Sequence, residues 1–250
     1  MMEEKRPSLS DETHIPDKGF ESKEIHSGRI GSILLLFFLL IIWPLSSYLL
    51  MKEQQPQLSA TGFEGINLST QIYLPTILIQ LLVFLLITLV LRLEKESFSS
   101  IGLKGFDLRN LLIGVFSWFG MSFLLLMMSF LLRSYNLSTS PEVLKLLPRT
   151  TPQKFLWIVM AMSASLAEES AFRGFVLTRL NLYLKNWWLT ILIASISFSL
   201  GHLYQGTAGT IFAGIYGILF SFLFLWRKSL APCMSAHFLQ DATPLFAPLS

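Results

Sequence analysis

Five ionisable side chains stand in apolar surroundings in the last third of the chain. Beyond residue 154 the sequence holds only three carboxylates and two histidines: Glu168, Glu169, Asp241, His202 and His237. Such groups transfer protons in general acid–base catalysis, and the same types line ion and proton paths through membranes. A charge at the middle of a membrane helix costs about 2.5–3.5 kcal/mol on insertion scales. We therefore expect these groups to face the protein interior or water. Catalysis is favoured over an ion or proton path, and both over a purely structural role.

Helical spacing separates the two adjacent glutamates. Glu169 and Arg173 are four residues apart, in the order that favours an ion pair within one helix. Glu168 points about 100° away around the same helix, where no cation follows at that spacing. We therefore expect Glu169 and Arg173 to pair. Glu168 is expected to remain a free carboxylate, which suits a general base.

The histidines come from the segments that follow. If a helical hairpin turns near Lys185, Glu168 and His202 lie 17 residues before and after the turn. Two antiparallel helices would then hold them at similar depth. His237 and Asp241 are four residues apart and share one helix face. A simple count of depth does not bring His237 level with His202, so the last helix must be tilted, start late or be broken.

The composition indicates the kind of structure that must position these groups. Hydrophobic residues make up 52% of the 250 residues, and charged residues only 14%. Soluble domains carry about 25% charged residues, so an ordinary soluble enzyme is excluded. The net charge of +3, without basic stretches interleaved with aromatics, speaks against a nucleic-acid partner. The lone Cys233 excludes an internal disulfide and a thiolate metal cluster.

Apolar segments predict an all-α, polytopic membrane helix bundle of about seven transmembrane helices. About 20 apolar residues span a bilayer core. Suitable segments are residues 30–51, 65–91, 110–132, 154–185, two within 186–226, and 230–250. Pro44 is expected to kink the first helix. The helix over 154–185 would carry its charges near mid-depth.

The charges outside these segments predict the domain organisation and the topology. Residues 1–29 hold 7 of the 16 acids and 5 of the 19 bases, which indicates a disordered polar tail before a membrane domain over 30–250. With the N-terminus in the cytoplasm, the cytoplasmic segments hold 14 Lys and Arg residues and the opposite side 5. Because Lys and Arg favour cytoplasmic loops, we expect an integral, multi-pass protein with a cytoplasmic N-terminus. In a bacterial host it would lie in the plasma membrane.

Three motifs follow one another in this part of the chain. They read EESAFR over residues 168–173, FSLGH over 198–202 and HFLQD over 237–241. Together they resemble the CPBP family, the CAAX-protease and bacteriocin-processing membrane proteins also called Abi, whose pattern is EExxxR, FxxxH and then HxxxN or HxxxD. The resemblance covers about residues 154–245 and marks 154–250 as a CPBP-like catalytic core. The stretch SSIGL over 99–103 is similar to a common upstream feature of the family.

The resemblance implies an intramembrane endopeptidase of the type II CAAX prenyl endopeptidase kind. Such an enzyme would act on a membrane-embedded or membrane-bound peptide or protein. By this analogy the six candidate catalytic residues work in pairs: Glu168 with His202 on a water, His237 with Asp241 on the oxyanion, and Glu169 with Arg173 as orienting groups. Many prenyl proteases have Asn at the position of Asp241. An ionised Asp cannot donate a hydrogen bond, so Asp241 would have to be protonated or would instead orient His237.

The need for a cofactor stays open at this stage. Glu168, His202 and His237 could ligate zinc in principle. The sequence lacks the H-E-x-x-H helix of many zinc peptidases, which favours a site that requires no metal over one with a divalent metal such as zinc.

Two other functions compete with proteolysis. Some members of the family act by binding other membrane proteins, so a non-catalytic membrane scaffold or a bacteriocin-immunity-type protein is the alternative. A transporter or proton path ranks below it, because inverted repeats would favour one and the sequence contains none. Other intramembrane proteases fit poorly, since there is no G-x-S-G motif and only one membrane aspartate.

Overall fold

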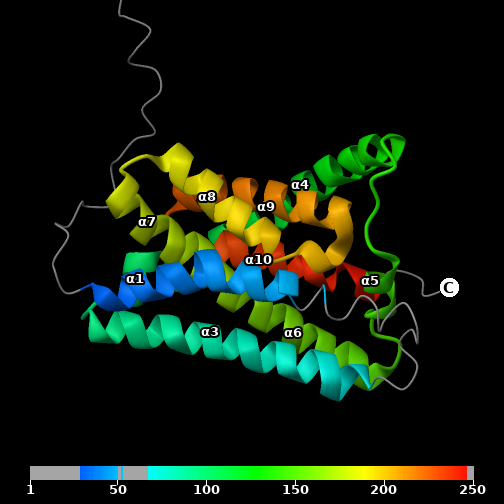
Figure 1. Cartoon of the computed structure of the whole chain (residues 1–250), viewed down its shortest axis with the longest axis horizontal. Coiled ribbons are helices and arrows are strands. Elements are labelled where there is room, and N and C mark those ends of the chain that lie inside the picture. Colours follow the sequence, from blue (N-terminus) through cyan, green and yellow to red (C-terminus); the bar gives the residue numbers. More distant parts are fainter. Residues whose placement is uncertain (1–28, 50–51, 53–66, 247–250) are drawn as a thin grey trace, which may run out of the picture.

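The computed structural model describes residues 29–49, 52 and 67–246, and every regular element in these residues is a helix (Figure 1). The prediction of an all-α bundle is therefore confirmed. The predicted polar tail falls almost entirely on residues 1–28, which lie outside the described residues.

Five helices in the described residues are long and apolar enough to cross a membrane. They are Ile30–Leu49, Ser69–Leu93, Leu108–Ser134, Thr151–Leu184 and Leu203–Arg227. The other two predicted spans are helices α8 (Trp187–Leu200) of 14 residues and α10 (Ala231–Ala242) of 12. A full crossing takes about 20 residues, so α8 and α10 are too short to cross the apolar layer alone. The five long helices make this an integral membrane protein.

The elements of the described residues follow in chain order. The first half contains α1 (Ile30–Phe37), η1 (Phe38–Ile42), η2 (Ser69–Tyr73), α3 (Leu74–Leu93), η3 (Phe98–Ile101), α4 (Leu108–Ser134) and α5 (Pro141–Lys145). The second half contains α6 (Thr151–Glu168), η4 (Glu169–Val176), α7 (Leu177–Leu184), α8, η5 (Leu203–Gln205), α9 (Gly206–Arg227), α10 and η6 (Thr243–Phe246). The π-helical turn η1 ends two residues before Pro44, and the kink expected at Pro44 stays a prediction.

Helices α6, η4 and α7 form one continuous helix of 34 residues. At its start, the Thr150 side chain accepts a hydrogen bond from the backbone amide of Gln153. In return, the Gln153 side chain accepts a hydrogen bond from the backbone amide of Thr150. This capping box satisfies two amides that have no partner within the helix. At its end, Lys185 adopts a left-handed conformation with φ of 48°, and Asn186 caps α8. The hairpin predicted near Lys185 is thus confirmed.

Helix α10 lies in the middle of the bundle and packs against α4, α6 and α9 (Figure 1). Gly114 permits the close approach of α4. A Cβ atom at this position would overlap Ser235 Oγ and lie 2.5 Å from the Pro232 carbonyl oxygen. Gly217 plays the same part between α9 and α8, where an added Cβ would lie 2.9 Å from the Ser195 Cβ.

The π-helical segment η4 is buried along its whole length. The η3 turn packs against it so closely that a Cβ on Gly174 would lie 2.9 Å from the Ile101 carbonyl oxygen. Gly102, with φ of 77°, follows η3, and its carbonyl accepts a hydrogen bond of 2.9 Å from the Leu230 amide just before α10. The SSIGL stretch therefore holds η4 and the start of α10 in place.

Candidate active site

Glu169 connects the long helix to α10. One oxygen, Oε1, accepts a hydrogen bond of 2.9 Å from Arg173 Nη1 and another of 2.7 Å from His237 Nδ1. The side chains of Glu169 and Arg173 are 0% and 1% exposed. The predicted pairing of Glu169 with Arg173 is confirmed. Glu169 also holds His237 through a hydrogen bond, which helical spacing alone could not predict.

The hydrogen bond to Glu169 sets the orientation of the His237 ring. Because a carboxylate only accepts, Nδ1 carries the hydrogen. The other nitrogen, Nε2, lies 3.4 Å from Asp241 Oδ2 and 4.0 Å from Glu168 Oε2. Helix α10 begins at Ala231, and the long helix runs obliquely from α6 to α7 past it (Figure 1). His237 thereby lies beside both glutamates, while its depth relative to His202 stays a prediction.

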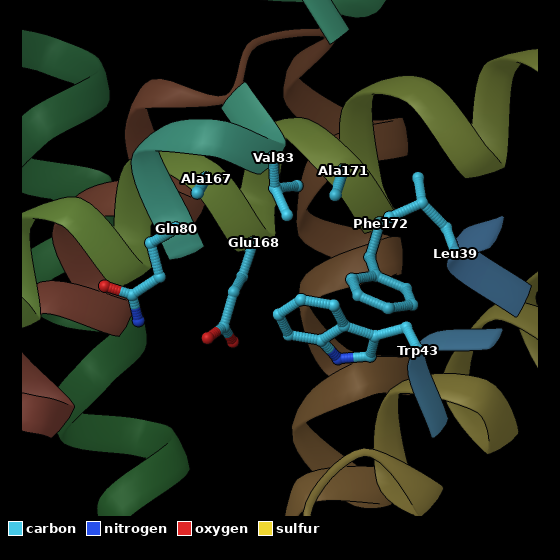
Figure 2. Close-up of a pocket in the computed structure, with 8 residues that line it drawn as sticks. All are labelled: Leu39, Trp43, Gln80, Val83, Ala167, Glu168, Ala171 and Phe172. Carbon is cyan, nitrogen blue, oxygen red and sulfur yellow. The ribbon is translucent and has the colours of Figure 1, made fainter. Parts of the chain in front are cut away.

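Glu168 is the last residue of α6 and lines a small, open pocket. Figure 2 shows its carboxylate extending into the space between Gln80 and the indole of Trp43. Oxygen Oε2 is buried and accepts no hydrogen bond from any residue that the structure describes. A carboxylate that lacks a partner and points into a pocket is available to a water or a substrate, whereas Oε1 of Glu169 already accepts hydrogen bonds from Arg173 and His237.

His202 lies in the turn just after α8, within electrostatic range of Glu168. Its Nδ1 lies 2.8 Å from the carbonyl oxygen of Phe198, one helical turn earlier. Since a carbonyl can only accept, Nδ1 carries the hydrogen, and Nε2 of the neutral ring is an acceptor. The ring centroid stands 4.5 Å from that of Phe198. His202 thus presents a basic nitrogen on an aromatic support.

Aromatic rings surround the buried cation. The Arg173 guanidinium lies 4.2 Å from the centroid of Phe198 and 5.2 Å from that of Phe220. Phe172 meets Phe198 edge-on with centroids 5.1 Å apart. The faces of such rings attract a cation, so Phe198 supports both Arg173 and His202. The phenylalanine of the FxxxH motif therefore has a physical role beyond filling space.

Asp241 stands at the rim of the site, with a side chain that is 36% exposed. Its backbone carbonyl accepts a hydrogen bond of 2.7 Å from the indole nitrogen of Trp157 on α6. This bond ties the end of α10 to the long helix. The carboxylate itself is the group nearest to the free nitrogen of His237.

The donors considered for zinc do not gather into a metal site. Within the part of the chain that the structure describes, no three or more His, Cys, Asp or Glu side chains are grouped so as to hold a metal ion. His237 Nδ1 is occupied by Glu169, and its Nε2 is 4.0 Å from Glu168.

Sequence reasoning missed the pocket wall that faces Glu168. Gln80 and Val83 of α3, with Leu39 and Trp43 of the first helix, supply this wall. Gln80 could have been noticed, because it is the only amide side chain within α3. Trp43 carries no such signal, since apolar helices contain many aromatic residues.

The comparisons with known proteins agree with the motifs. Residues 150–243 match the family model described as type II CAAX prenyl endopeptidase Rce1-like. This stretch holds all three motifs, so the resemblance predicted from the sequence is confirmed there. The first helix, α3 and α4 lie outside it. Neither the search of curated proteins nor the search of solved structures found a match.

Proposed function

We propose that this chain, whose residues 150–243 belong to the type II CAAX prenyl endopeptidase Rce1-like family, is an intramembrane endopeptidase. It hydrolyses a peptide bond in a membrane-embedded or membrane-bound peptide or protein. The observation that carries the proposal is the buried Glu168 carboxylate, which has no hydrogen-bond partner among the described residues and points into a pocket. His202 and His237 both lie within its electrostatic range.

In the first step, Glu168 and His202 activate a water. The water donates one hydrogen bond to Glu168 and the other to Nε2 of His202, which the Phe198 contact keeps as an acceptor. As the water oxygen bonds to the carbonyl carbon of the substrate, one proton passes to Glu168. The π electrons of the carbonyl move to its oxygen and form a tetrahedral oxyanion.

In the second step, His237 acts as an imidazolium with hydrogens on both nitrogens and stabilises the oxyanion through the hydrogen on Nε2. Glu169 anchors the opposite nitrogen of the ring, and Asp241 lies 3.4 Å from Nε2. We assign Asp241 to the orientation of His237, because an ionised carboxylate has no hydrogen to donate. When the oxyanion collapses, the carbon–nitrogen bond breaks and Glu168 passes its proton to the leaving amine. The products are a carboxylic acid and an amine, and the site returns to its starting state.

Glu169 and Arg173 act as positioning residues. The cation offsets the charge of Glu169 inside an apolar shell of rings, so a carboxylate can be buried beside His237 without a separate counter-ion. The ring of His237 is then held from behind, with its second nitrogen toward the pocket.

The test uses the purified full chain in proteoliposomes with a set of membrane-anchored peptides. Glu168→Gln and His202→Ala should each lower kcat/KM by about 10²–10⁴-fold, the usual contribution of a general base. Asp107→Asn is the matched control. It also removes a carboxylate, but one that caps α4, and Asn caps helices as well as Asp does.

Equal cleavage by the parent and by Glu168→Gln would refute the mechanism. A parent protein that binds peptides but cleaves none would favour the scaffold function instead. A parallel reaction with a zinc chelator should proceed unchanged, and a loss of activity that zinc restores would assign a metal to the site.

A further inference from the structure

The pocket beside Glu168 has two walls of different origin. One wall comes from the family-matched segment, through Glu168, Ala167, Ala171 and Phe172. The other comes from outside it, through Leu39 and Trp43 of the first helix and Gln80 and Val83 of α3. Figure 2 shows Gln80 and Glu168 at one end and Phe172, Trp43 and Leu39 at the other. The two polar residues of the lining, Gln80 and Glu168, thus mark a polar end of the pocket, and the aromatic residues mark an apolar end.

The polar end holds a hydrogen-bond donor, the side-chain amide of Gln80. Gln80 is only 7% exposed, and its Oε1 accepts a hydrogen bond of 2.6 Å from Ser163 Oγ on α6. This bond fixes the amide, and Nε2 remains accessible to a ligand. A carbonyl oxygen of a ligand bound beside Glu168 can accept a hydrogen bond from this nitrogen. A peptide backbone supplies that oxygen.

The apolar end is closed by Trp43. The indole lies below the ring of Phe172 in Figure 2. Its nitrogen sits where a Cβ on Gly201 would be only 3.1 Å away, in the turn that carries His202. Ser47, one helical turn after Trp43, donates a hydrogen bond of 2.7 Å to the Gly201 carbonyl. The first helix is thus fastened to the turn of His202, and Trp43 forms a fixed boundary of the pocket.

We propose that Gln80 and Trp43, both outside the family-matched segment, position and select the substrate of this protease. Gln80 donates a hydrogen bond from Nε2 to a backbone carbonyl beside the cleaved bond. Trp43 limits the size of the uncharged, apolar side chain that enters the far end of the pocket. The inference rests on the proposed function, since it names the substrate contacts of that same site.

For Trp43, the experiment measures kcat/KM of the full chain in proteoliposomes. The substrates are peptides that differ at one residue beside the cleaved bond, with Ala, Val, Leu, Phe or Trp there. Trp43→Ala should raise the ratio of kcat/KM for the Trp peptide over the Ala peptide at least tenfold. Trp43→Leu, which keeps an apolar packing residue, should shift the ratio in the same direction. A merely structural Trp43 would lower all five rates alike, and an unchanged ranking in both variants would overturn the proposal.

For Gln80, the variant is Gln80→Leu, which keeps the size of the side chain and removes the donor. We expect kcat/KM to fall about tenfold, as for one lost hydrogen bond, with an unchanged pH profile. Ser163→Ala is the control, because it removes the bond between α3 and α6 and leaves the Gln80 amide. It should change kcat/KM less than threefold. Equal losses in the two variants would mean that Gln80 only joins the helices and would overturn its assignment.

The two proposals fail in distinguishable ways. If the parent cleaves peptides and Glu168→Gln does not, the proposed function stands whatever the Gln80 and Trp43 variants do. Unchanged specificity then defeats this inference alone. If the parent cleaves none of the peptides, the proposed function fails and this inference fails with it.

Discussion

Replacing Arg173 with methionine should destabilise the protein strongly, because it leaves a buried carboxylate without its cation. The Arg173 side chain is 1% exposed, and that of its partner Glu169 is fully buried. Removing one member of a buried pair costs about 3–5 kcal/mol. The guanidinium also lies 4.2 Å from the ring centroid of Phe198, a contact worth up to about 2 kcal/mol when desolvated. His237 still donates to Glu169 and offsets part of the loss.

We therefore expect Arg173→Met to lower the free energy of unfolding by about 3–5 kcal/mol, a large part of the 5–15 kcal/mol typical of folded proteins. Adding Glu169→Gln to the same chain should recover at least about 2 kcal/mol, because it removes the buried charge that Arg173→Met leaves without its cation. The two substitutions are therefore not additive, as expected for residues in direct contact.

The measurement is reversible unfolding of the purified protein in mixed micelles, followed through a complete double-mutant cycle. Arg109→Met is the control, since Arg109 is exposed and such a surface change alters stability by about 0.5 kcal/mol or less. A loss below about 1 kcal/mol for Arg173→Met, or strict additivity with Glu169→Gln, would refute the reasoning. Either result would mean that water or another group compensates the charge of Glu169.

Three further predictions concern the rim of the site, the packing of α10 and the topology. Asp241→Asn should keep kcat/KM within about tenfold of the parent, because the amide can accept from His237 and also donate to an oxyanion; a loss as large as that of Asp241→Ala would show that the negative charge itself is needed. Gly114→Ala should lower the free energy of unfolding by about 1–3 kcal/mol through overpacking against α10, and an unchanged denaturation midpoint would contradict this contact. The native Cys233 is buried and should not react with an impermeant thiol reagent. Lys104→Cys should react with this reagent only from the cytoplasmic side, and Arg133→Cys only from the opposite side. The reverse pattern would contradict the proposed topology.

Spacing along a single helix was the part of the site that the sequence could predict. Glu169 and Arg173 pair because four residues make about one helical turn, and this rule depends on nothing outside the helix. The turn at Lys185 was predictable for a similar reason, since polar residues interrupt the apolar run there. Both predictions needed only local information.

Contacts between distant segments were not predictable in the same way. The position of His237 beside Glu169 depends on how α10 packs against the long helix and on the close approach of α4 at Gly114. A count of residues per helix contains neither quantity. The π-helical segment η4 has no sequence signature that we could have applied, and the pocket wall with Gln80 comes from a helix without any of the motifs.

The two glutamates are adjacent in the sequence, but the bundle places their side chains in different surroundings. Neighbouring residues of a helix point about 100° apart, so a helix at the edge of a pocket directs one side chain into the pocket and the next into the core. Glu168 takes the first direction and has no hydrogen-bond partner among the described residues. Glu169 takes the second, where Arg173 and His237 satisfy the same oxygen. Exchanging the two environments would require a rotation of the helix that also removes Arg173 from its aromatic shell. The free carboxylate therefore depends on its neighbour's ion pair, which fixes the rotation of the helix.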